Sequence, residues 1–349
     1  MKKKIGVIFG GNSPEYYISL QSAHSIISNI DSKYDVILIG ITKDGDWYHY
    51  SGNVDKLLTD EWFNNDECTK VMISPNISDH GIIEFTDNEV IKTRIDVFFP
   101  ILHGKNGEDG TVQGLIEVTG IPYVGCGVLS SAVCMDKFIS HEIANQNGIM
   151  TAKSIMINNY EDVNEYLEQI NNIGYPVFVK PLRAGSSFGI SKVNNEKELT
   201  KAVELAFNYD SKIIIEETIN GIEVGCAVLG NNELIVGVVD EIQLEKSLGF
   251  FDYKEKYEER TSEIICPAVS MSKDKQEEIR ELAKKIYRAL DCKGFARIDM
   301  FLTSDGTIYL NEVNTIPGFT IHSRYPAMLK EIGLSFKDIV NKLIELEIA

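Results

Sequence analysis

Three oxygen-bearing side chains near the C-terminal end of the sequence have the spacing of two paired strands. Asp299 shares a strand face with Arg297, and Glu312 shares one with Asn314, because alternate residues of a strand point to the same side. A turn near residues 304–306 would pair the strands and bring Asp299, Glu312 and Asn314 together. Three oxygen ligands without Cys or His suit a hard cation, most often Mg²⁺, which also takes phosphate oxygens. Spacing alone leaves open a solvated, exposed sheet face.

A lysine followed by a small-residue loop suggests phosphate binding. Lys180 ends the apolar run 177–180, and residues 183–189 read Arg-Ala-Gly-Ser-Ser-Phe-Gly. Backbone N–H groups and hydroxyls of such a loop can close over phosphates. The alternatives are a lysine that extends to solvent along an apolar surface and an ordinary turn.

Two further polar segments follow apolar runs directly. Residues 103–110 contain three glycines and follow the apolar run 96–102, at the end of a strand where open α/β sheets bind ligands. Glu15 follows the glycine turn after the first strand and could bind an ammonium group. A polar surface loop and a solvated glutamate are the alternatives.

The elements that would position these groups begin with an α/β pattern. Short apolar strands are expected at residues 5–9, 36–41 and 96–102, and a helix at 19–30. Strand, tight glycine turn and helix are typical of a doubly wound parallel sheet. Residues 130–147 predict one long helix that ends at Gly148.

The remainder of the chain predicts a mixed α+β unit. Helices are expected near residues 195–208 and 273–290. Strands are expected at residues 177–180, 213–217, 224–229, 235–239, 297–302 and 308–313. The polar segment 244–262, with Gly249 as a possible hinge, is long for a loop inside a compact domain, and such loops are usually functional or disordered.

Composition limits the possible partners and location. The 349 residues carry a net charge of −18, which disfavours nucleic acid but not a nucleotide held by a few lysines. The six cysteines are scattered without a CxxC pair, which predicts reduced, mostly buried thiols and no zinc site. No segment approaches the ~20 apolar residues of a membrane span. We expect a cytoplasmic protein.

The combined motifs resemble the D-alanine–D-alanine ligase family of the ATP-grasp superfamily. The resemblance covers nearly the whole chain, in segments 10–20, 103–114, 121–137, 177–193, 249–257 and 294–320. It implies an α/β and α+β protein in which a doubly wound parallel-sheet domain precedes a two-part ATP-grasp domain. The implied domains are an N-terminal substrate domain (1–130), a central lid subdomain (131–215) and a C-terminal catalytic subdomain (216–349). ATP would lie between the last two, and a homodimer is implied.

The resemblance also assigns roles to residues. Glu15 would bind the amine of a first D-alanine, His103 would lie near that substrate, and Arg297 with the backbone of Gly318 would stabilise an oxyanion. Ser186 and Tyr257 would hydrogen-bond when the lid closes. The residues implied to contact ATP are Lys137, Lys180, Ser187, Glu216, Glu223 and Lys256. Those implied to hold two Mg²⁺ ions, which Mn²⁺ could replace, are Asp299, Glu312 and Asn314.

The implied reaction joins two D-amino acids. The carboxylate of D-alanine would attack the γ-phosphate of ATP to form D-alanyl phosphate, and the amine of the second amino acid would then attack the acyl carbon. A lid formed by residues 244–262 would exclude water from the acyl phosphate.

The second substrate is suggested by Ser323 and Arg324. An arginine at position 324 resembles the VanG-type D-alanine–D-serine ligases of vancomycin resistance, whereas D-alanine–D-alanine ligases typically carry an apolar residue there. A polar pocket would favour D-serine for peptidoglycan precursors. The alternative is that Arg324 only pairs with a nearby acid. The protein would then be a housekeeping D-alanine–D-alanine ligase. Tyr257 argues against D-lactate.

Two readings from other classes remain. A nucleotide-binding regulator without catalysis would be expected to lack part of the lysine and metal set, which is intact here. An ATP-grasp ligase for another acid is opposed by Glu15 together with Tyr257.

Overall fold

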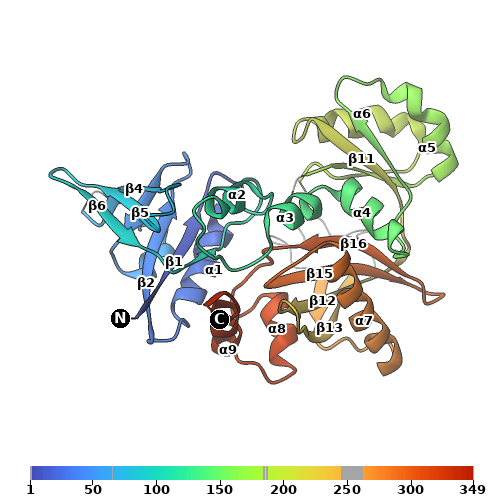
Figure 1. Cartoon of the computed structure of the whole chain (residues 1–349). Helices are drawn as coiled ribbons and strands as arrows, with labels where there is room; N and C mark the ends of the chain where they lie inside the picture. Colours follow the sequence, from blue (N-terminus) through green and yellow to red (C-terminus); the bar gives the residue numbers. More distant parts are fainter. Residues whose placement is uncertain (1, 65, 184, 186–187, 245–261, 349) are drawn as a thin grey trace.

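The computed structural model describes residues 2–64, 66–183, 185, 188–244 and 262–348. Three sheets follow one another along the chain (Figure 1). The first has the order β6 (Val90–Arg94), β5 (Gly81–Phe85), β4 (Cys68–Ile73), β3 (Trp47–Tyr50), β2 (Tyr34–Ile41), β1 (Lys3–Gly10) and β7 (Val97–Pro100). The second has the order β10 (Ser191–Val193), β9 (Val177–Pro181), β11 (Lys212–Glu217) and β8 (Ser154–Asn158). The third has the order β14 (Ser262–Ile265), β13 (Ile235–Leu244), β12 (Gly221–Leu229), β15 (Phe295–Thr303) and β16 (Ile308–Asn314).

The helices of the described chain are α1 (Tyr16–Ile27), α2 (Thr111–Glu117), α3 (Val128–Met135), α4 (Lys137–Gln146), α5 (Leu167–Ile173), α6 (Glu196–Phe207), α7 (Lys273–Ala289), α8 (Arg324–Lys330) and α9 (Phe336–Ile348). Short 3₁₀ turns occur at Val54–Leu57 and Val163–Tyr166. Within the described ranges, no helix combines the length and apolar character needed to cross a membrane.

The expected α/β and α+β fold class is confirmed. In the first sheet β1 runs parallel to β2 and β7, as a doubly wound pattern requires. The segment between β2 and β7 adds four antiparallel strands at one edge. The second and third sheets are antiparallel throughout.

One sequence expectation is wrong. The single helix predicted over residues 130–147 is two helices, α3 and α4, separated at Asp136. This residue is extended, with φ −91° and ψ 98°, and its side chain accepts a hydrogen bond from the Ile139 N–H at 3.1 Å. An aspartate that caps a helix in this way starts a new helix, so Lys137 becomes the first residue of α4.

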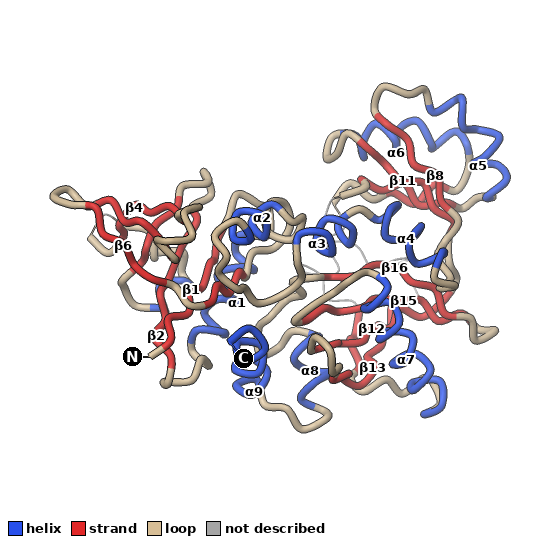
Figure 2. The backbone as a smooth tube through the Cα atoms, viewed as in Figure 1, coloured by secondary structure: helices blue, strands red, loops and turns tan. Residues whose placement is uncertain are grey.

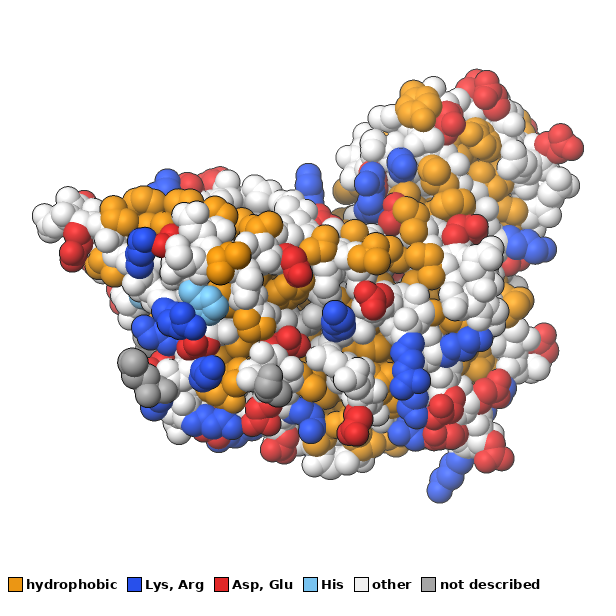
Figure 3. All heavy atoms as spheres, viewed as in Figure 1, with side chains coloured by type: hydrophobic (Ala, Val, Ile, Leu, Met, Phe, Trp, Pro, Cys, Tyr) orange, Lys and Arg blue, Asp and Glu red, His pale blue; other side chains and the backbone are white. Residues whose placement is uncertain are grey.

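Helices cover the outer faces of the second and third sheets. Figure 2 shows α5 and α6 on the side of the second sheet that faces away from the third, while α7 and α8 cover the opposite side of the third sheet. The lobe that contains the second sheet projects from the rest of the molecule (Figure 3). The first and third sheets, in contrast, share one buried core that includes Phe99 and Phe295, whose ring centroids are 6.5 Å apart.

Candidate active site

Two cavities meet at the junction of the three sheets. The larger, of about 630 Å³, lies between the second and third sheets. The smaller, of about 420 Å³, extends toward the first sheet and is lined by Glu15 and His103. Lys137 and Glu312 line both cavities, and Lys137 Nζ is 3.6 Å from Glu312 Oε2. A charged group transferred between the cavities would therefore pass a lysine and a carboxylate.

The three expected metal ligands are brought together on β15 and β16. Asp299 lies opposite Glu312, and Arg297 lies opposite Asn314. The Asn314 side-chain amide donates to Asp299 Oδ2 at 2.9 Å. Arg297 donates to both oxygens of Asp299, at 2.8 Å from Nε and 2.6 Å from Nη2. Burial opposes the charge of Arg297, but Asp299 raises the arginine's pKa above its usual value.

The donor chemistry of this group suits a hard cation only in part. Asp299, Glu312 and Asn314 offer oxygen atoms, which Mg²⁺ prefers. Among the described residues, however, no three His, Cys, Asp or Glu side chains are grouped so that they alone could hold a metal ion. A bound cation would need further oxygen atoms from a ligand, as Mg²⁺ sites that hold nucleotide phosphates do.

The expected phosphate lysines lie on the wall of the larger cavity. Lys180, at the end of β9, lies with its Nζ 2.6 Å from Glu216 Oε2 on β11. Burial alone would raise the pKa of Glu216, yet Lys180 and the neighbouring His141 hold that pKa below its ordinary value. Glu216 is therefore an ionised carboxylate on the cavity wall. His141, on α4, lines the same cavity and was not singled out from the sequence, where a lone histidine in a helix carries no signal.

Glu15 lies against two glycines, and a larger residue at either position would displace the Glu15 side chain. It immediately precedes α1 and lines the smaller cavity. A Cβ on Gly104 would be 2.5 Å from Glu15 Oε2, and one on Gly185 would be 2.9 Å from the same atom. Gly185 belongs to the Gly/Ser loop after β9, so this loop reaches the first-sheet side of the cavity.

His103 is buried and orders the loop that follows β16. Its Nδ1 lies 2.9 Å from the Ile316 carbonyl, which can only accept, so Nδ1 carries a proton. Its Nε2 then accepts from the Ser22 hydroxyl at 3.3 Å, and Ser22 Oγ accepts from the Phe319 N–H at 3.3 Å. Burial lowers the pKa of His103 to about 4, with a smaller opposing effect from the Ile316 carbonyl. This neutral imidazole fixes the loop that presents the backbone of Gly318 to the cavity.

Glu108 is a second site residue that the sequence did not single out. It lines the smaller cavity and accepts from the Gly104 N–H at 2.7 Å and the Ile316 N–H at 3.3 Å. Burial, followed by the charge of Glu15, raises the pKa of Glu108 to about 8. It lay inside the glycine-rich segment 103–110, but nothing in its own spacing set it apart.

Arg324 begins α8 and is held by acids from three strands. It donates to Asp240 from Nε at 2.7 Å and Nη2 at 2.8 Å, and to Glu223 from Nη1 at 3.1 Å. Its Nη1 is 3.7 Å from Asp299 Oδ1. Burial opposes the charge of Arg324, but these acids, Asp240 foremost, raise its pKa well above the usual value. Arg324 also lines the smaller cavity, as does Ser323, whose Oγ accepts from the Thr320 N–H at 3.0 Å.

Glu223 lines the larger cavity and contacts Arg324, which lines the smaller one. It was expected to contact a nucleotide and does line the larger cavity, but its carboxylate also accepts from Arg324. The remaining expected site residues, Ser186, Ser187, Lys256 and Tyr257, lie outside the described residues, as does most of the proposed lid.

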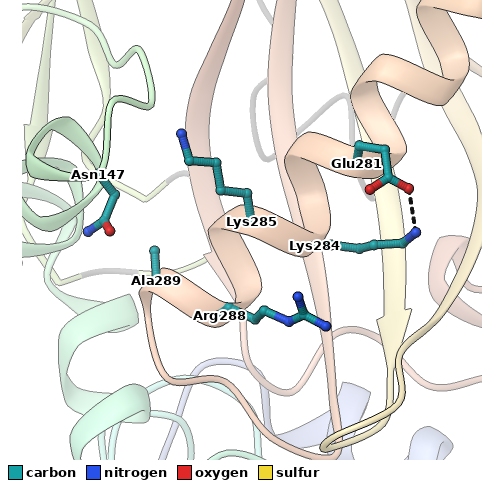
Figure 4. A pocket seen from close by; sticks show the side chains of 6 residues that line it. All are labelled: Asn147, Glu281, Lys284, Lys285, Arg288 and Ala289. Atoms are coloured by element: carbon teal, nitrogen blue, oxygen red, sulfur yellow. Dashed lines mark hydrogen bonds and ion pairs between the residues drawn. The ribbon is translucent and has the colours of Figure 1, made fainter.

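A third hollow, of about 410 Å³, lies away from this site. It is lined by the end of α4 and by α7, and Figure 4 shows Lys285 and Arg288 beside a Glu281–Lys284 pair. These are solvated side chains of a helix surface that converge on no buried polar group of the described ranges, so they do not form a second candidate active site.

The chain is similar to known proteins along nearly its whole length. Residues 4–126 match the family description "D-ala D-ala ligase N-terminus", and residues 143–345 match "D-ala D-ala ligase C-terminus". The vancomycin C-type resistance protein VanC1 of Enterococcus gallinarum is 45% identical over 347 residues, covering 99% of this chain and 98% of that protein. A D-alanine–D-alanine ligase of Thermoanaerobacter sp. (strain X514) is 45% identical over 351 residues, covering 99% and 97%. The crystal structure of the VanG D-Ala:D-Ser ligase from Enterococcus faecalis has a TM-score of 0.93 at 52% identity, covering 99% of this chain and 100% of that one.

Proposed function

Because the chain belongs to the D-alanine–D-alanine ligase family, whose members are ATP-dependent ligases, we propose that it joins D-alanine to D-serine through D-alanyl phosphate. The product would enter peptidoglycan precursors and reduce their binding of vancomycin. D-serine, the acyl phosphate intermediate and the homodimer implied by the resemblance are parts of this proposal.

The observation that carries the proposal is the meeting of the two cavities at Lys137 and Glu312. The larger cavity has the volume of a nucleotide site and apolar side chains on both sheets, Phe178 on one and Phe301 on the other. Its phosphate end would lie near Lys137 and Lys180. The smaller cavity, of about 420 Å³, carries charged side chains and has room for two amino acids, so a carboxylate held there would face the terminal phosphate across the junction.

The side chains of the smaller cavity fit two amino acids. Glu15 would bind the ammonium group of D-alanine and orient its carboxylate toward the junction. The amine of the second substrate would attack the acyl carbon, and the developing oxyanion would be stabilised by Arg297 and the Gly318 N–H. Arg297 can serve this role through an N–H group that is not hydrogen-bonded to Asp299.

Two Mg²⁺ ions would be held by Asp299, Glu312 and Asn314 together with phosphate oxygens. When bound, they would neutralise the charge that develops on the transferred phosphoryl group. The three side chains fit this role in donor type, and Glu312 lies beside Lys137.

The preference for D-serine rests on the charged wall around Arg324. The wall comprises Arg324, which lines the smaller cavity, and its hydrogen-bond partners Asp240 and Glu223. A D-serine hydroxyl could accept from a guanidinium N–H of Arg324, whereas the methyl group of D-alanine offers no such partner.

One observation favours the alternative of a housekeeping D-alanine–D-alanine ligase. Arg324 already donates three hydrogen bonds to Asp240 and Glu223, as an arginine with only a structural role would. In that case its contribution would be to the packing of α8 on the third sheet, and the second substrate would be a second D-alanine.

Product analysis distinguishes the two. Purified protein is incubated with ATP, Mg²⁺ and equimolar D-alanine and D-serine, and the dipeptides are identified by mass spectrometry. We expect mainly D-Ala-D-Ser. Mainly D-Ala-D-Ala would overturn the D-serine assignment but keep the ligase, and absence of both dipeptides and of phosphate release would overturn the ligase itself.

A further inference from the structure

A hydrogen bond between Glu223 and Arg324 joins the two cavities of the candidate site. Glu223, on β12, lines the larger cavity, and Arg324, the first residue of α8, lines the smaller one. Among the described lining residues, neither belongs to the cavity of the other. Arg324 Nη1 donates to Glu223 Oε1 at 3.1 Å, so this one contact reaches from one cavity to the other.

The third sheet places three carboxylates around this arginine. Glu223 and Gly225 share a face of β12, because alternate residues of a strand point to the same side. Gly225 lies opposite Asp240 on β13 and opposite Asp299 on β15. Since Gly225 has no side chain, the guanidinium of Arg324 fits over it, and a Cβ there would be 2.5 Å from Nη2. Arg324 therefore lies over a gap in the middle of an acidic patch.

The guanidinium divides its donors unequally among these acids. Asp240 accepts from Nε at 2.7 Å and from Nη2 at 2.8 Å, a two-point pairing that fixes one edge of the guanidinium. Nη1 lies at the other edge, where Glu223 accepts at 3.1 Å and Asp299 Oδ1 is 3.7 Å away. Glu223 is thus the hydrogen-bond partner that orients Nη1.

Both side chains of this contact are largely shielded from water. That of Arg324 is 10% exposed, and that of Glu223 is 17% exposed. A charge-assisted hydrogen bond is stronger in such surroundings than in water, and solvent replaces it less easily. A ligand that contacts the Glu223 carboxylate in the larger cavity therefore changes how firmly Nη1 is held beside the smaller one.

We propose that Glu223 is a positioning residue for the second substrate: its hydrogen bond to Arg324 couples the nucleotide in the larger cavity to the preference for D-serine in the smaller cavity. This inference rests on the proposed ligase function, which places ATP in one cavity and the second amino acid in the other. Coupling between two binding sites is reciprocal, so Arg324 in turn orients the Glu223 carboxylate toward the nucleotide.

Glu223→Gln tests the coupling with a change that retains the shape of the side chain. The variant loses the charge-assisted hydrogen bond, while Arg324 keeps both bonds to Asp240. With saturating ATP and equimolar D-alanine and D-serine, the ratio of D-Ala-D-Ser to D-Ala-D-Ala is expected to fall about threefold. The KM for D-serine should rise while the KM for the first D-alanine stays unchanged, although Glu223 is not among the residues that line the smaller cavity.

Glu217→Gln is the matched control. Glu217 also lines the larger cavity, but it belongs to β11 of the second sheet and its Oε1 accepts from the Lys153 N–H at 2.8 Å. The control removes a carboxylate from the same cavity and leaves the Glu223–Arg324 contact in place. The product ratio should therefore equal that of the wild-type protein, whatever the effect on nucleotide affinity.

A second background tests whether Glu223 acts through Arg324. In Arg324→Met, Asp240→Asn, no guanidinium remains to be positioned and no buried carboxylate is left unpaired. Adding Glu223→Gln to this background should leave its product ratio unchanged, because the two sites act through one contact.

Nucleotide binding tests the reciprocal effect without turnover. The dissociation constant of adenylyl imidodiphosphate, a non-hydrolysable ATP analogue, is measured by calorimetry with Mg²⁺ and without D-amino acids. The variant Arg324→Met, Asp240→Asn is expected to bind the analogue about threefold more weakly than the wild-type protein, because the Glu223 carboxylate is no longer oriented. Arg324 is not among the described residues that line the larger cavity, so a direct contact does not account for this loss.

The outcomes separate this inference from the proposed function. An unchanged product ratio in a folded Glu223→Gln protein overturns the coupling, and so does an equal fall in Glu217→Gln. A further threefold fall when Glu223→Gln is added to the background without Arg324 also overturns it, because Glu223 would then act by another route.

A wild-type protein that makes neither dipeptide overturns the proposed function instead. If the wild-type protein makes mainly D-Ala-D-Ala, the binding of the analogue decides. An affinity that stays unchanged after the loss of Arg324 then overturns the coupling, and a threefold loss supports it.

Discussion

Asp240 accepts two hydrogen bonds from the guanidinium of Arg324, at 2.7 Å from Nε and 2.8 Å from Nη2. The Asp240 side chain is fully buried and that of Arg324 is 10% exposed, and Glu223 accepts a third hydrogen bond from the same guanidinium. The backbone makes room for the pair, because a Cβ on Gly225 would lie 2.5 Å from Arg324 Nη2 and from Asp240 Oδ1. Planar, two-point pairing of this kind is specific to arginine, so the wall of the smaller cavity depends on all three residues.

Arg324→Met should lower the preference for D-serine over D-alanine about tenfold, because the hydroxyl loses a polar partner worth roughly 1.4 kcal/mol. The same substitution leaves Asp240 buried without its counter-charge and should destabilise the fold by about 3 kcal/mol. Dipeptide products in equimolar D-serine and D-alanine measure the first effect, and chemical denaturation measures the second.

The double variant Arg324→Met, Asp240→Asn separates these effects. Without the unpaired carboxylate, it should regain most of the lost stability while the preference for D-serine stays low. An Arg324→Met protein that still makes mainly D-Ala-D-Ser would show that the guanidinium acts only in packing.

Gly225→Ala should disturb the same wall from the backbone. Its Cβ cannot fit beside the paired side chains without displacing them, and the neighbouring Met328 at 3.1 Å closes the remaining space. We expect a loss of about 2 kcal/mol in the free energy of unfolding, as for other overpacked cores, together with a reduced preference for D-serine.

Gly114→Ala is the matched control for that variant. Gly114 lies in α2, and a Cβ there would meet nothing within 4 Å. Alanine favours a helix over glycine, so this change should stabilise the protein by about 0.5–1 kcal/mol and leave the products unaltered. If Gly225→Ala were as stable as Gly114→Ala, the close packing described for Gly225 would be wrong.

Local alternation predicted only part of the convergence of Asp299, Glu312 and Asn314. The side-chain period of 2 places Arg297 with Asp299 on one face and Glu312 with Asn314 on one face. A register shift between Asp299 and Met300, which the sequence did not indicate, then puts Glu312 rather than Asn311 opposite Asp299. The lysine at the end of β9 was conspicuous in the sequence because it is a charged residue that closes a buried strand.

The contacts that depend on distant packing could not be predicted in this way. Asp240 and Arg324 are 84 positions apart, and their pairing depends on how α8 lies on the third sheet. His141 lies beside Glu216 because the predicted long helix is interrupted at Asp136. Helix periodicity does not predict this interruption, since an aspartate is equally compatible with an exposed helix position and with an N-cap. Tertiary geometry, not residue type, made these groups part of the site.

Asp299→Asn should reduce phosphate release by a factor on the order of 100 or more, because a neutral ligand weakens cation binding next to the transferred phosphoryl group. It should also lower stability, since Arg297, whose side chain is only 14% exposed, loses the charge of its buried partner. Phosphate release at increasing Mg²⁺ concentration measures the first effect, and partial recovery at high Mg²⁺ is expected.

Asp305→Asn is the control for this change. Asp305 lies in the exposed turn between β15 and β16, where it caps the Thr303 hydroxyl and the Thr307 N–H, and its substitution removes a carboxylate from the same hairpin. Normal phosphate release in Asp305→Asn is expected. Normal release in a folded Asp299→Asn protein would remove Asp299 from the proposed metal site.

His103 should make stability depend on pH on the acid side of neutrality. Its pKa is about 4 in the folded protein, against 6.5 for an ordinary histidine, because burial disfavours the charged ring. The unfolded chain therefore binds more protons between these values, so the contribution of His103 is fully present above pH 6.5 and is lost as the pH falls toward 4. A shift of this size corresponds to about 3 kcal/mol.

The effect is isolated by comparing wild-type protein with His103→Asn, whose amide can still donate to the Ile316 carbonyl. Glu108 opposes the trend, because its raised pKa of about 8 makes its contribution largest at low pH and removes it as the pH rises from about 4.5 to 8. Both proteins retain Glu108, so its contribution largely cancels in the difference between their free energies of unfolding. That difference should favour the wild type progressively more from pH 4 to 6.5 and then become constant. A difference independent of pH would mean that His103 is not held neutral by burial, and that the loop carrying Gly318 is ordered in some other way.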